Sequence, residues 1–281
     1  MMTLVDMAYA FPVGWVVMLG ILGLLVGSFL NVVICRLPAS LMARWQNEAC
    51  QILNMPQPVR ATYNLCWPPS ACASCQRPLL RRDLVPVFSW CLLRGKSRCC
   101  SQPISRRYPL VELACGILFA SAGMLWPPGV RLAAILVLLS ILLTLAVIDA
   151  RTLLLPDVLT IPLIWIGLLV NIDGSFASLP DAVCGAAVSY LIFSGLALMF
   201  RYLTGKEGLG GGDAKLLAAF GAWFGWTILP HLVTIAACGA LIAGISMRLF
   251  WRRSLTQPIP FGPWLIMAGG VSIFMSYGFP A

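Results

Sequence analysis

Long apolar runs, interrupted by short polar segments, dominate the pattern of this chain. Eight of these runs can be counted, at residues 13–35, 110–126, 132–148, 157–172, 182–200, 214–229, 231–250 and 261–279. A helix needs about 20 apolar residues to cross the hydrocarbon core of a bilayer, and several runs are somewhat shorter. Because an isolated span in lipid must satisfy its own backbone hydrogen bonds, the pattern predicts an all-α polytopic membrane protein with about eight transmembrane helices.

Composition supports this interpretation. The chain of 281 residues is 60% hydrophobic and 10% charged, whereas a soluble domain usually contains about 25% charged residues. Lipid is therefore the expected solvent for most of the chain. Pro230 separates the sixth and seventh runs, and we predict a tight hairpin there because proline interrupts helices.

The basic residues predict the orientation. Eleven of the 19 Lys and Arg residues lie between Arg36 and Arg107, seven more lie in loops on the same side, and Arg131 alone lies opposite. The positive-inside rule makes the basic side cytoplasmic, with one large cytoplasmic loop and both termini periplasmic. Basic loops also contact anionic membrane lipid, so the net charge of +9 does not indicate a nucleic-acid partner.

The runs and loops predict three segments. Residues 1–35 form an N-terminal anchor helix, which we expect to be retained because it lacks a basic start and a cleavage site. Residues 36–108 form a cytoplasmic loop domain that contains cysteines. Residues 109–281 form a domain embedded in the membrane.

Two aspartates lie where apolar runs meet the cytoplasmic side. Asp149 ends the third run, in LTLAVIDARTLLLPD, and Asp213 opens the sixth, in EGLGGGDAKLLAAF. Acidic groups are costly in or near the hydrocarbon region and usually have a function there. Two neighbouring carboxyl groups tend to share one proton, so one can activate water while the other protonates a leaving amine. This is the chemistry of an aspartic protease.

The residues around Asp213 suit that chemistry. Gly208, Gly210, Gly211 and Gly212 allow a close approach of the backbone to a substrate. Lys215 can orient a carboxylate or bind substrate. The alternative is structural: Asp213 caps its own helix, and Asp149 forms an ion pair with Arg151 or Lys215.

Other catalytic motifs are absent from the sequence. The glycine run matches neither the P-loop nor the G-x-G-x-x-G pattern. His231 is the single histidine and lies at the external end of the sixth run, which excludes H-E-x-x-H zinc chemistry and argues against a Ser-His-Asp triad with Asp213.

The cytoplasmic loop contains a second group of candidate residues. Cys72 and Cys75 form a C-x-x-C pair, and Cys99 and Cys100 follow. Cytosolic thiols stay reduced, which favours a metal site over disulfides. Four thiolates can hold a structural zinc ion, with a thiol redox role as the alternative.

Several segments together resemble those of a known family, the type IV prepilin peptidases of type IV pilus and type II secretion systems. The matching segments are GSFLNVVICRLP (27–38), the C-x-x-C pair, DLVPVFSWCLLRGKSRCC (83–100), RRYPLVEL (106–113), DARTLLLPDVLTIPL (149–163), GKEGLGGGDAKLLAAFGAW (205–223) and PFGPW (260–264). The resemblance covers nearly the whole chain.

The resemblance implies a role for individual residues. Asp149 and Asp213 match the family's catalytic aspartates. Gly210, Gly212 and Lys215 match its G-x-G-D-x-K frame, although alanine follows the aspartate where the family usually has phenylalanine.

The loop cysteines match less completely. Cys72, Cys75 and Cys100 match three of the family's four loop cysteines, and Ser97 stands at the fourth position. Cys99, two residues further on, is then the candidate for the fourth metal ligand.

The resemblance also implies the reaction and its location. The enzyme removes a short basic leader from prepilins or pseudopilins after a glycine, at the cytoplasmic face of the bacterial inner membrane. It then methylates the new terminal amine with S-adenosylmethionine, for which residues 27–38 and the loop are candidate sites. Two alternatives remain open: a proton-coupled transporter that uses both aspartates, and a membrane-anchored zinc module that recruits partners.

Overall fold

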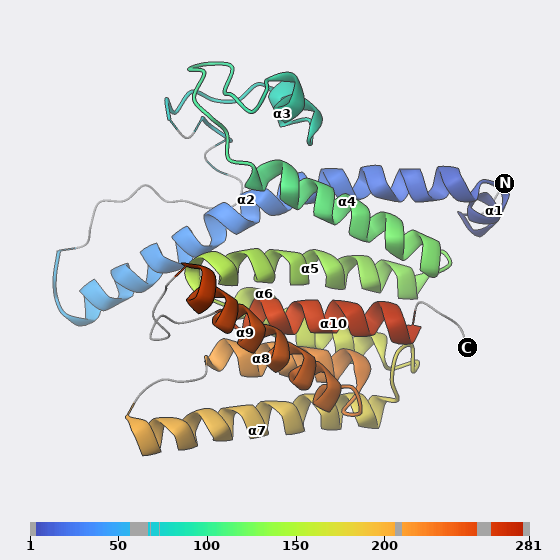
Figure 1. Ribbon diagram of the computed structural model, residues 1–281, viewed down its shortest axis with the longest axis vertical. Coiled ribbons are helices and arrows are strands. Elements are labelled where there is room, and N and C mark those ends of the chain that lie inside the picture. Colours follow the sequence, from blue (N-terminus) through green and yellow to red (C-terminus); the bar gives the residue numbers. More distant parts are fainter. Residues whose placement is uncertain are drawn as a thin grey trace. The chain divides into compact units, whose positions relative to one another are not determined.

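Helices make up all the regular structure of the described residues, which are 4–56, 67, 69–72, 74–205, 210–251 and 260–277 of a computed structural model. Extended pairing within these residues is limited to two isolated bridges, between Ala71 and Pro78 and between Lys96 and Pro103. The elements, labelled in Figure 1, are α1 (Leu4–Ala10), α2 (Pro12–Ile52), the 3-10 helix η1 (Arg81–Leu84), α3 (Phe88–Leu92), α4 (Arg107–Leu125), α5 (Val130–Thr152), α6 (Asp157–Val170), α7 (Leu179–Thr204), α8 (Gly211–Phe224), α9 (Leu229–Trp251) and α10 (Gly262–Tyr277). The predicted all-α class is confirmed.

Helices α2 and α4 to α10 correspond to the eight predicted runs. Among the described residues, five helices are long and apolar enough to cross a membrane: Pro12–Ile52, Arg107–Leu125, Val130–Thr152, Leu179–Thr204 and Leu229–Ser246. Helices α6 and α10 supply shorter apolar segments, and α8, with 14 residues, is about 21 Å long. The chain is thus a multi-pass membrane protein, as predicted.

The chain folds as two compact units, Met1–Pro128 and Gly129–Ala281. The sequence instead predicted three segments, with boundaries after residues 35 and 108. The difference arises because α4 packs along α2 and therefore belongs to the first unit. Whether the three predicted segments have separate roles stays a prediction.

Small residues bring α2 and α4 of the first unit together. A Cβ atom added to Gly23 would lie 2.6 Å from the carbonyl oxygen of Cys115, and one added to Gly27 would lie 2.8 Å from Cα of Glu112. Membrane helices commonly pack through such small residues, because lipid provides no hydrophobic force to join them. The two helices lie side by side in Figure 1.

The loop that carries Cys99 and Cys100 is folded tightly on itself. The Trp90 indole N–H donates to the carbonyl of Ile104 over 3.3 Å, and the Ile104 N–H donates to the carbonyl of Gly95 over 2.7 Å. Gly95 has a φ of +70°, and an added Cβ would lie 2.9 Å from the Trp90 ring. A glycine is therefore required at this turn.

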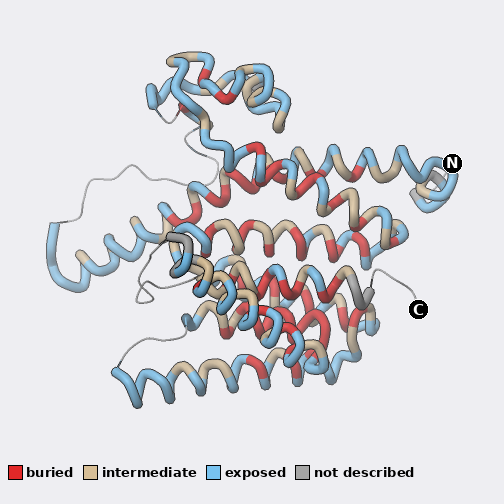
Figure 2. The backbone as a smooth tube through the Cα atoms, viewed as in Figure 1, coloured by how far each residue is buried: buried red, intermediate tan, exposed pale blue. Residues whose placement is uncertain are grey.

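Helix α8 forms the centre of the second unit. Its residues from Ala214 to Phe224 are buried apart from Lys215, and it contacts α6, α7, α9 and α10. Figure 2 shows α8 largely in the colour of buried residues, whereas α7 is mostly exposed. A helix too short to span a bilayer by itself is thus enclosed by protein.

Close backbone contacts and one buried amide hold these helices together. Gly185 of α7 packs directly on Gly221 of α8. The Asn171 side chain donates to the carbonyls of Ala222 and Trp223, at 2.9 and 2.8 Å, and its oxygen accepts from two N–H groups of the α6–α7 link. All the hydrogen-bonding groups of this buried amide have partners, as such groups require.

The predicted break between the sixth and seventh runs is present, but it lies at residues 225–228 and not at Pro230. Helix α8 ends at Phe224, Gly225 follows with a φ of +77°, and α9 begins at Leu229. Pro230 lies in the first turn of α9, where a missing N–H removes no hydrogen bond.

Candidate active site and cysteine cluster

Asp149 lies inside the last turn of α5, which continues to Thr152. Leu153 ends the helix with a φ of +54°, and its N–H donates to the Asp149 carbonyl over 2.9 Å. The Asp149 side chain is buried, and its Oδ2 atom accepts no hydrogen bond from any described residue. A buried polar atom without a partner is unusual and suggests that a water or substrate group binds there.

Asp213 is the third residue of α8 and is half-buried. Gly210 is the N-cap, and its backbone N–H donates to the Asp213 carboxylate. This bond resembles one half of a capping box, and a carboxylate in a first turn also interacts favourably with the helix dipole. Asp213 therefore stabilises the start of α8, although the cap position itself belongs to glycine.

The fold brings the two aspartates together. They are 64 positions apart in the sequence (213 − 149), yet the Asp149 carboxylate acts electrostatically on that of Asp213. Both lie within one turn of a helix end, Asp149 in α5 and Asp213 in α8. A proton pathway through the membrane would need acidic groups in mid-helix, so this position favours the peptidase interpretation over the transporter.

Two glycines allow close packing at and beside the pair. A Cβ atom added to Gly262, the first residue of α10, would lie 2.7 Å from Asp149 Oδ2. One added to Gly212 would lie 2.7 Å from Cβ of Leu155, in the turn between α5 and α6. The backbone amide of Gly262 also interacts with the Asp149 carboxylate. Gly208, predicted to act with these glycines, lies outside the described residues.

Lys215 forms an ion pair with Asp157, over 2.6 Å between Nζ and Oδ1. The alternative pairing of Lys215 with Asp149 is wrong, because Asp149 makes no salt bridge within the described part of the chain. Asp157 is the first residue of α6, so the ion pair joins the first turns of α6 and α8.

Gly262 and Asp157 were not predicted as site residues. Each lies within a segment that carries the family resemblance, PFGPW for Gly262 and DARTLLLPDVLTIPL for Asp157. Their positions in the sequence could have marked them as candidates. Their partners could not be read from the sequence, because each contact joins residues that are far apart in the chain.

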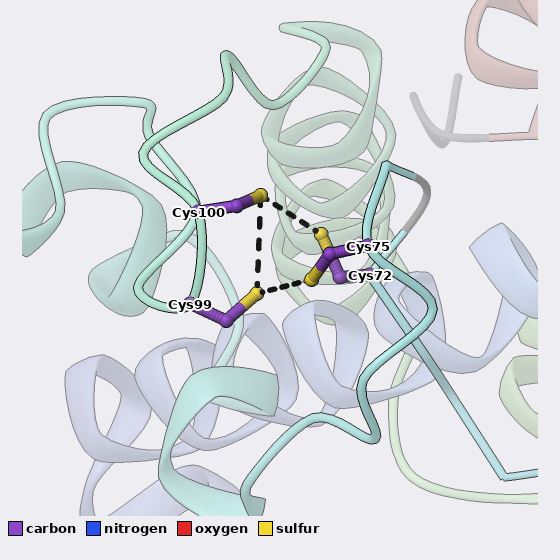
Figure 3. A group of neighbouring side chains, drawn as sticks. All are labelled: Cys72, Cys75, Cys99 and Cys100. Carbon is purple, nitrogen blue, oxygen red and sulfur yellow. Dashed lines mark hydrogen bonds between the residues drawn. The ribbon is translucent and has the colours of Figure 1, made fainter.

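The four predicted cysteines gather in the first unit (Figure 3). The Sγ atoms of Cys72, Cys75, Cys99 and Cys100 all lie within 4.8 Å of one another. Three of the Sγ–Sγ distances are 3.6 Å (Cys72–Cys100), 3.1 Å (Cys75–Cys99) and 4.0 Å (Cys99–Cys100). Tetrahedral zinc with four thiolates at about 2.3 Å places the sulfur atoms about 3.8 Å apart. The four side chains therefore fit a zinc ion.

Ser97 lies beside this cluster. Its Oγ atom is 3.4 Å from the sulfur of Cys72, 3.1 Å from that of Cys99 and 3.3 Å from that of Cys100. The Ser97 hydroxyl, with backbone hydrogen bonds from Cys75 and Ser74, lowers the pKa of Cys72 to about 5. The pKa of Cys75 moves the other way, to about 12: a backbone hydrogen bond from Arg77 lowers it, but the neighbouring Cys99 thiol and burial outweigh that effect. Metal binding requires all four cysteines as thiolates, so it would release protons from this cluster. Cys99 thus supplies the fourth sulfur, and Ser97 can hydrogen-bond to the ligands.

Family models match both parts of the chain. The model described as "Bacterial Peptidase A24 N-terminal domain" matches residues 21–126, which lie in the first unit. The model described as "Type IV leader peptidase family" matches residues 136–245, which include both aspartates.

Curated relatives match over nearly the full length. A protein of Pectobacterium carotovorum subsp. carotovorum is 49% identical, covering 96% of this chain and 97% of its own. One of Dickeya chrysanthemi is 48% identical, covering 98% of both chains, and one of Pseudomonas aeruginosa is 44% identical, covering 97% and 94%. All three are named "Prepilin leader peptidase/N-methyltransferase". No solved structure matches the chain.

The matched regions include the segments that resemble the type IV prepilin peptidases, and they include both Asp149 and Asp213. The chain belongs to the type IV leader peptidase family, as a multi-pass membrane enzyme with peptidase and methyltransferase activity.

Proposed function

We propose that this enzyme is an aspartic endopeptidase that removes the leader from prepilins or pseudopilins after a glycine and then methylates the new terminal amine. The meeting of Asp149 and Asp213 at two helix ends carries the peptidase part of this proposal. The curated names of relatives that are 44–49% identical support the substrate class and the second activity.

The aspartates can divide the work of peptide hydrolysis. The electrostatic repulsion between two neighbouring carboxylates falls when they share one proton. The ionised group takes a proton from water, and the water oxygen attacks the carbonyl carbon of the scissile peptide. The protonated group polarises the carbonyl oxygen, and the leaving amine receives a proton as the C–N bond breaks. The unpartnered Oδ2 of Asp149 is a suitable acceptor for the attacking water.

Two glycines let helices pack closely at the catalytic pair. Gly262 lets α10 begin directly beside the Asp149 carboxyl group, and Gly212 lets α8 begin directly against Leu155. Gly210 and Lys215 support the start of α8, where Asp213 lies. We therefore assign Gly210, Gly212 and Lys215 to the support of the catalytic pair and its substrate.

We propose that this site lies at the cytoplasmic face of the bacterial inner membrane, with both termini in the periplasm, because the basic loops predict this orientation by the positive-inside rule. A substrate with a basic leader and an apolar helix presents its junction at the same boundary. We propose that the processed subunits serve type II secretion or type IV pilus assembly.

We place methyl transfer in the first unit. S-adenosylmethionine supplies the methyl group, and residues 27–38 with the cytoplasmic loop are the candidate region for its site. One observation supports this choice: the aspartate pair and its contacts lie in the second unit, whereas residues 27–38 and the cysteine cluster lie in the first. Zinc at the four cysteines would brace the loop of the same unit.

Cleavage by purified variants tests the peptidase assignment. Asp149→Asn and Asp213→Asn should each abolish cleavage of a purified prepilin in detergent, while Asp173→Asn, at an exposed acid after α6, should cleave normally. A chelator should leave cleavage intact. Cleavage at the wild-type rate by either variant would assign that aspartate a structural role.

A further inference from the structure

Glu112 is a buried acid that the proposed peptidase chemistry does not use. It lies on α4 at the close crossing with α2, with 8% of its surface exposed. A carboxyl group is costly to bury unless it accepts hydrogen bonds. Glu112 has such bonds: its Oε2 atom accepts the backbone N–H of Val87 over 2.7 Å, and the side chains of Ser28 and Asn31 on α2 also interact with it.

Val87 occupies a strained turn. Its φ is +58° and its ψ is −49°, and the N–H of Phe88 donates to the carbonyl of Pro86 over 2.5 Å. These features define a γ-turn of the rare kind with positive φ. A β-branched residue is especially unfavourable at positive φ, so other contacts must hold this conformation. The bond from the Val87 N–H to Glu112 is such a contact.

This turn determines where the cysteine-bearing loop begins. Helix α3 starts at Phe88, directly after the turn, and the loop then runs through Cys99 and Cys100 to α4. At its other end, the Asn31 amide donates to the Tyr108 carbonyl over 3.0 Å, which fixes the start of α4 on α2. Glu112 and Asn31, which also interact with each other, thus attach both ends of the loop to the helix pair.

We propose that Glu112 is a positioning residue for methyl transfer: its buried carboxylate holds the γ-turn at Val87 and so keeps the cysteine-bearing loop in one place on α2 and α4. This proposal rests on the assignment of methyl transfer to the first unit. Glu112 acts here as a hydrogen-bond acceptor, and a neutral acceptor of the same shape should replace it.

Two substitutions at Glu112 test whether it acts as the hydrogen-bond acceptor for the Val87 N–H. Glu112→Gln keeps an oxygen that can accept the Val87 N–H, whereas Glu112→Ala removes it. Val87→Gly is the matched change at the turn, since glycine adopts positive φ without a Cβ clash. The double variant Glu112→Ala/Val87→Gly tests whether a turn without strain still needs the carboxylate.

Methylation of an already cleaved prepilin, followed by mass spectrometry with S-adenosylmethionine present, is the main measurement. Glu112→Ala should lower the methylation kcat roughly tenfold or more, because small displacements of a reacting group cost large factors in rate. Glu112→Gln should keep most of the methylation rate. In the double variant Glu112→Ala/Val87→Gly, the glycine should restore part of the rate that Glu112→Ala loses. Cleavage of an uncleaved prepilin should stay at the wild-type rate in all variants.

Amide hydrogen exchange gives an independent measurement. Exchange at Val87 should be faster in Glu112→Ala than in the wild type and close to the wild type in Glu112→Gln. Equal methylation by Glu112→Ala, or equal loss in both Glu112 variants with the turn still protected, would overturn the positioning role. A wild type that cleaves but never methylates would instead refute the proposed second activity, while exchange would still report whether Glu112 holds the turn.

Discussion

Single atoms decide the geometry around Asp149. Its Oδ2 atom is buried and has no partner among the described residues, and a Cβ atom added to Gly262, at the start of α10, would lie 2.7 Å from it. The same helix contains Gly270, where an added Cβ would meet nothing within 4 Å. The two glycines therefore differ in their surroundings, although both lie on one helix.

Gly262→Ala should lower kcat/KM for prepilin cleavage by roughly tenfold or more, because the added methyl group would contact Oδ2 and displace either the carboxyl group or α10. Gly270→Ala is the control and should cleave normally. Equal activity of the two variants would show that the space beside Asp149 is not needed.

At the scale of elements, the first turns of α6 and α8 are joined by one ion pair. Lys215 and Asp157 are partly exposed, at 27% and 55% of their side-chain surface. Exposed ion pairs contribute roughly 0–1 kcal/mol to stability, so this pair is not needed to fold the unit. The proposed role of the pair is to orient the start of α8, since Asp213 is two residues from Lys215 on the same helix.

Lys215→Asp should lower the kcat for cleavage, because two acids would then repel each other between α6 and α8. The reversed pair, Lys215→Asp with Asp157→Lys, should recover much of the lost rate. Reversal of Arg44 and Glu48, an exposed pair within α2, is the control and should have no effect. If the reversed pair at α6 and α8 recovers nothing, Lys215 contacts the substrate directly.

At the scale of the whole molecule, the two candidate sites lie in different compact units. The cysteine cluster belongs to the first unit, and both aspartates belong to the second. The two family models divide the chain in the same way, between residues 21–126 and 136–245. Changes at the cysteines should therefore leave the aspartate pair intact.

Cys99→Ser should reduce bound zinc well below about one ion per chain, measured by metal analysis of the purified protein, while cleavage continues. Cys91→Ser, at an exposed cysteine of α3, should keep its zinc. Adding Ser97→Cys to Cys99→Ser should restore binding, because Ser97 already lies near three of the sulfur atoms. Full zinc content in Cys99→Ser would exclude Cys99 as a ligand.

Much of this protein follows from sequence alone. The apolar runs predicted the helices, because lipid forces each span to satisfy its own backbone. The position of Asp149 and Asp213 at the ends of such runs made them candidates for a function, since acidic groups there are costly. The spacing of Cys72 and Cys75 likewise indicated a metal site, which the clustered sulfur atoms fit.

Tertiary structure alone decided which distant residues meet. Lys215 pairs with Asp157, Gly262 faces Asp149, and Glu112 holds the turn at Val87. Hydrophobic pattern specifies which segments enter the membrane, but it contains little information on how helices with apolar surfaces all round pack together. Small residues and a few buried hydrogen bonds set that packing, and their partners become visible only in the folded chain.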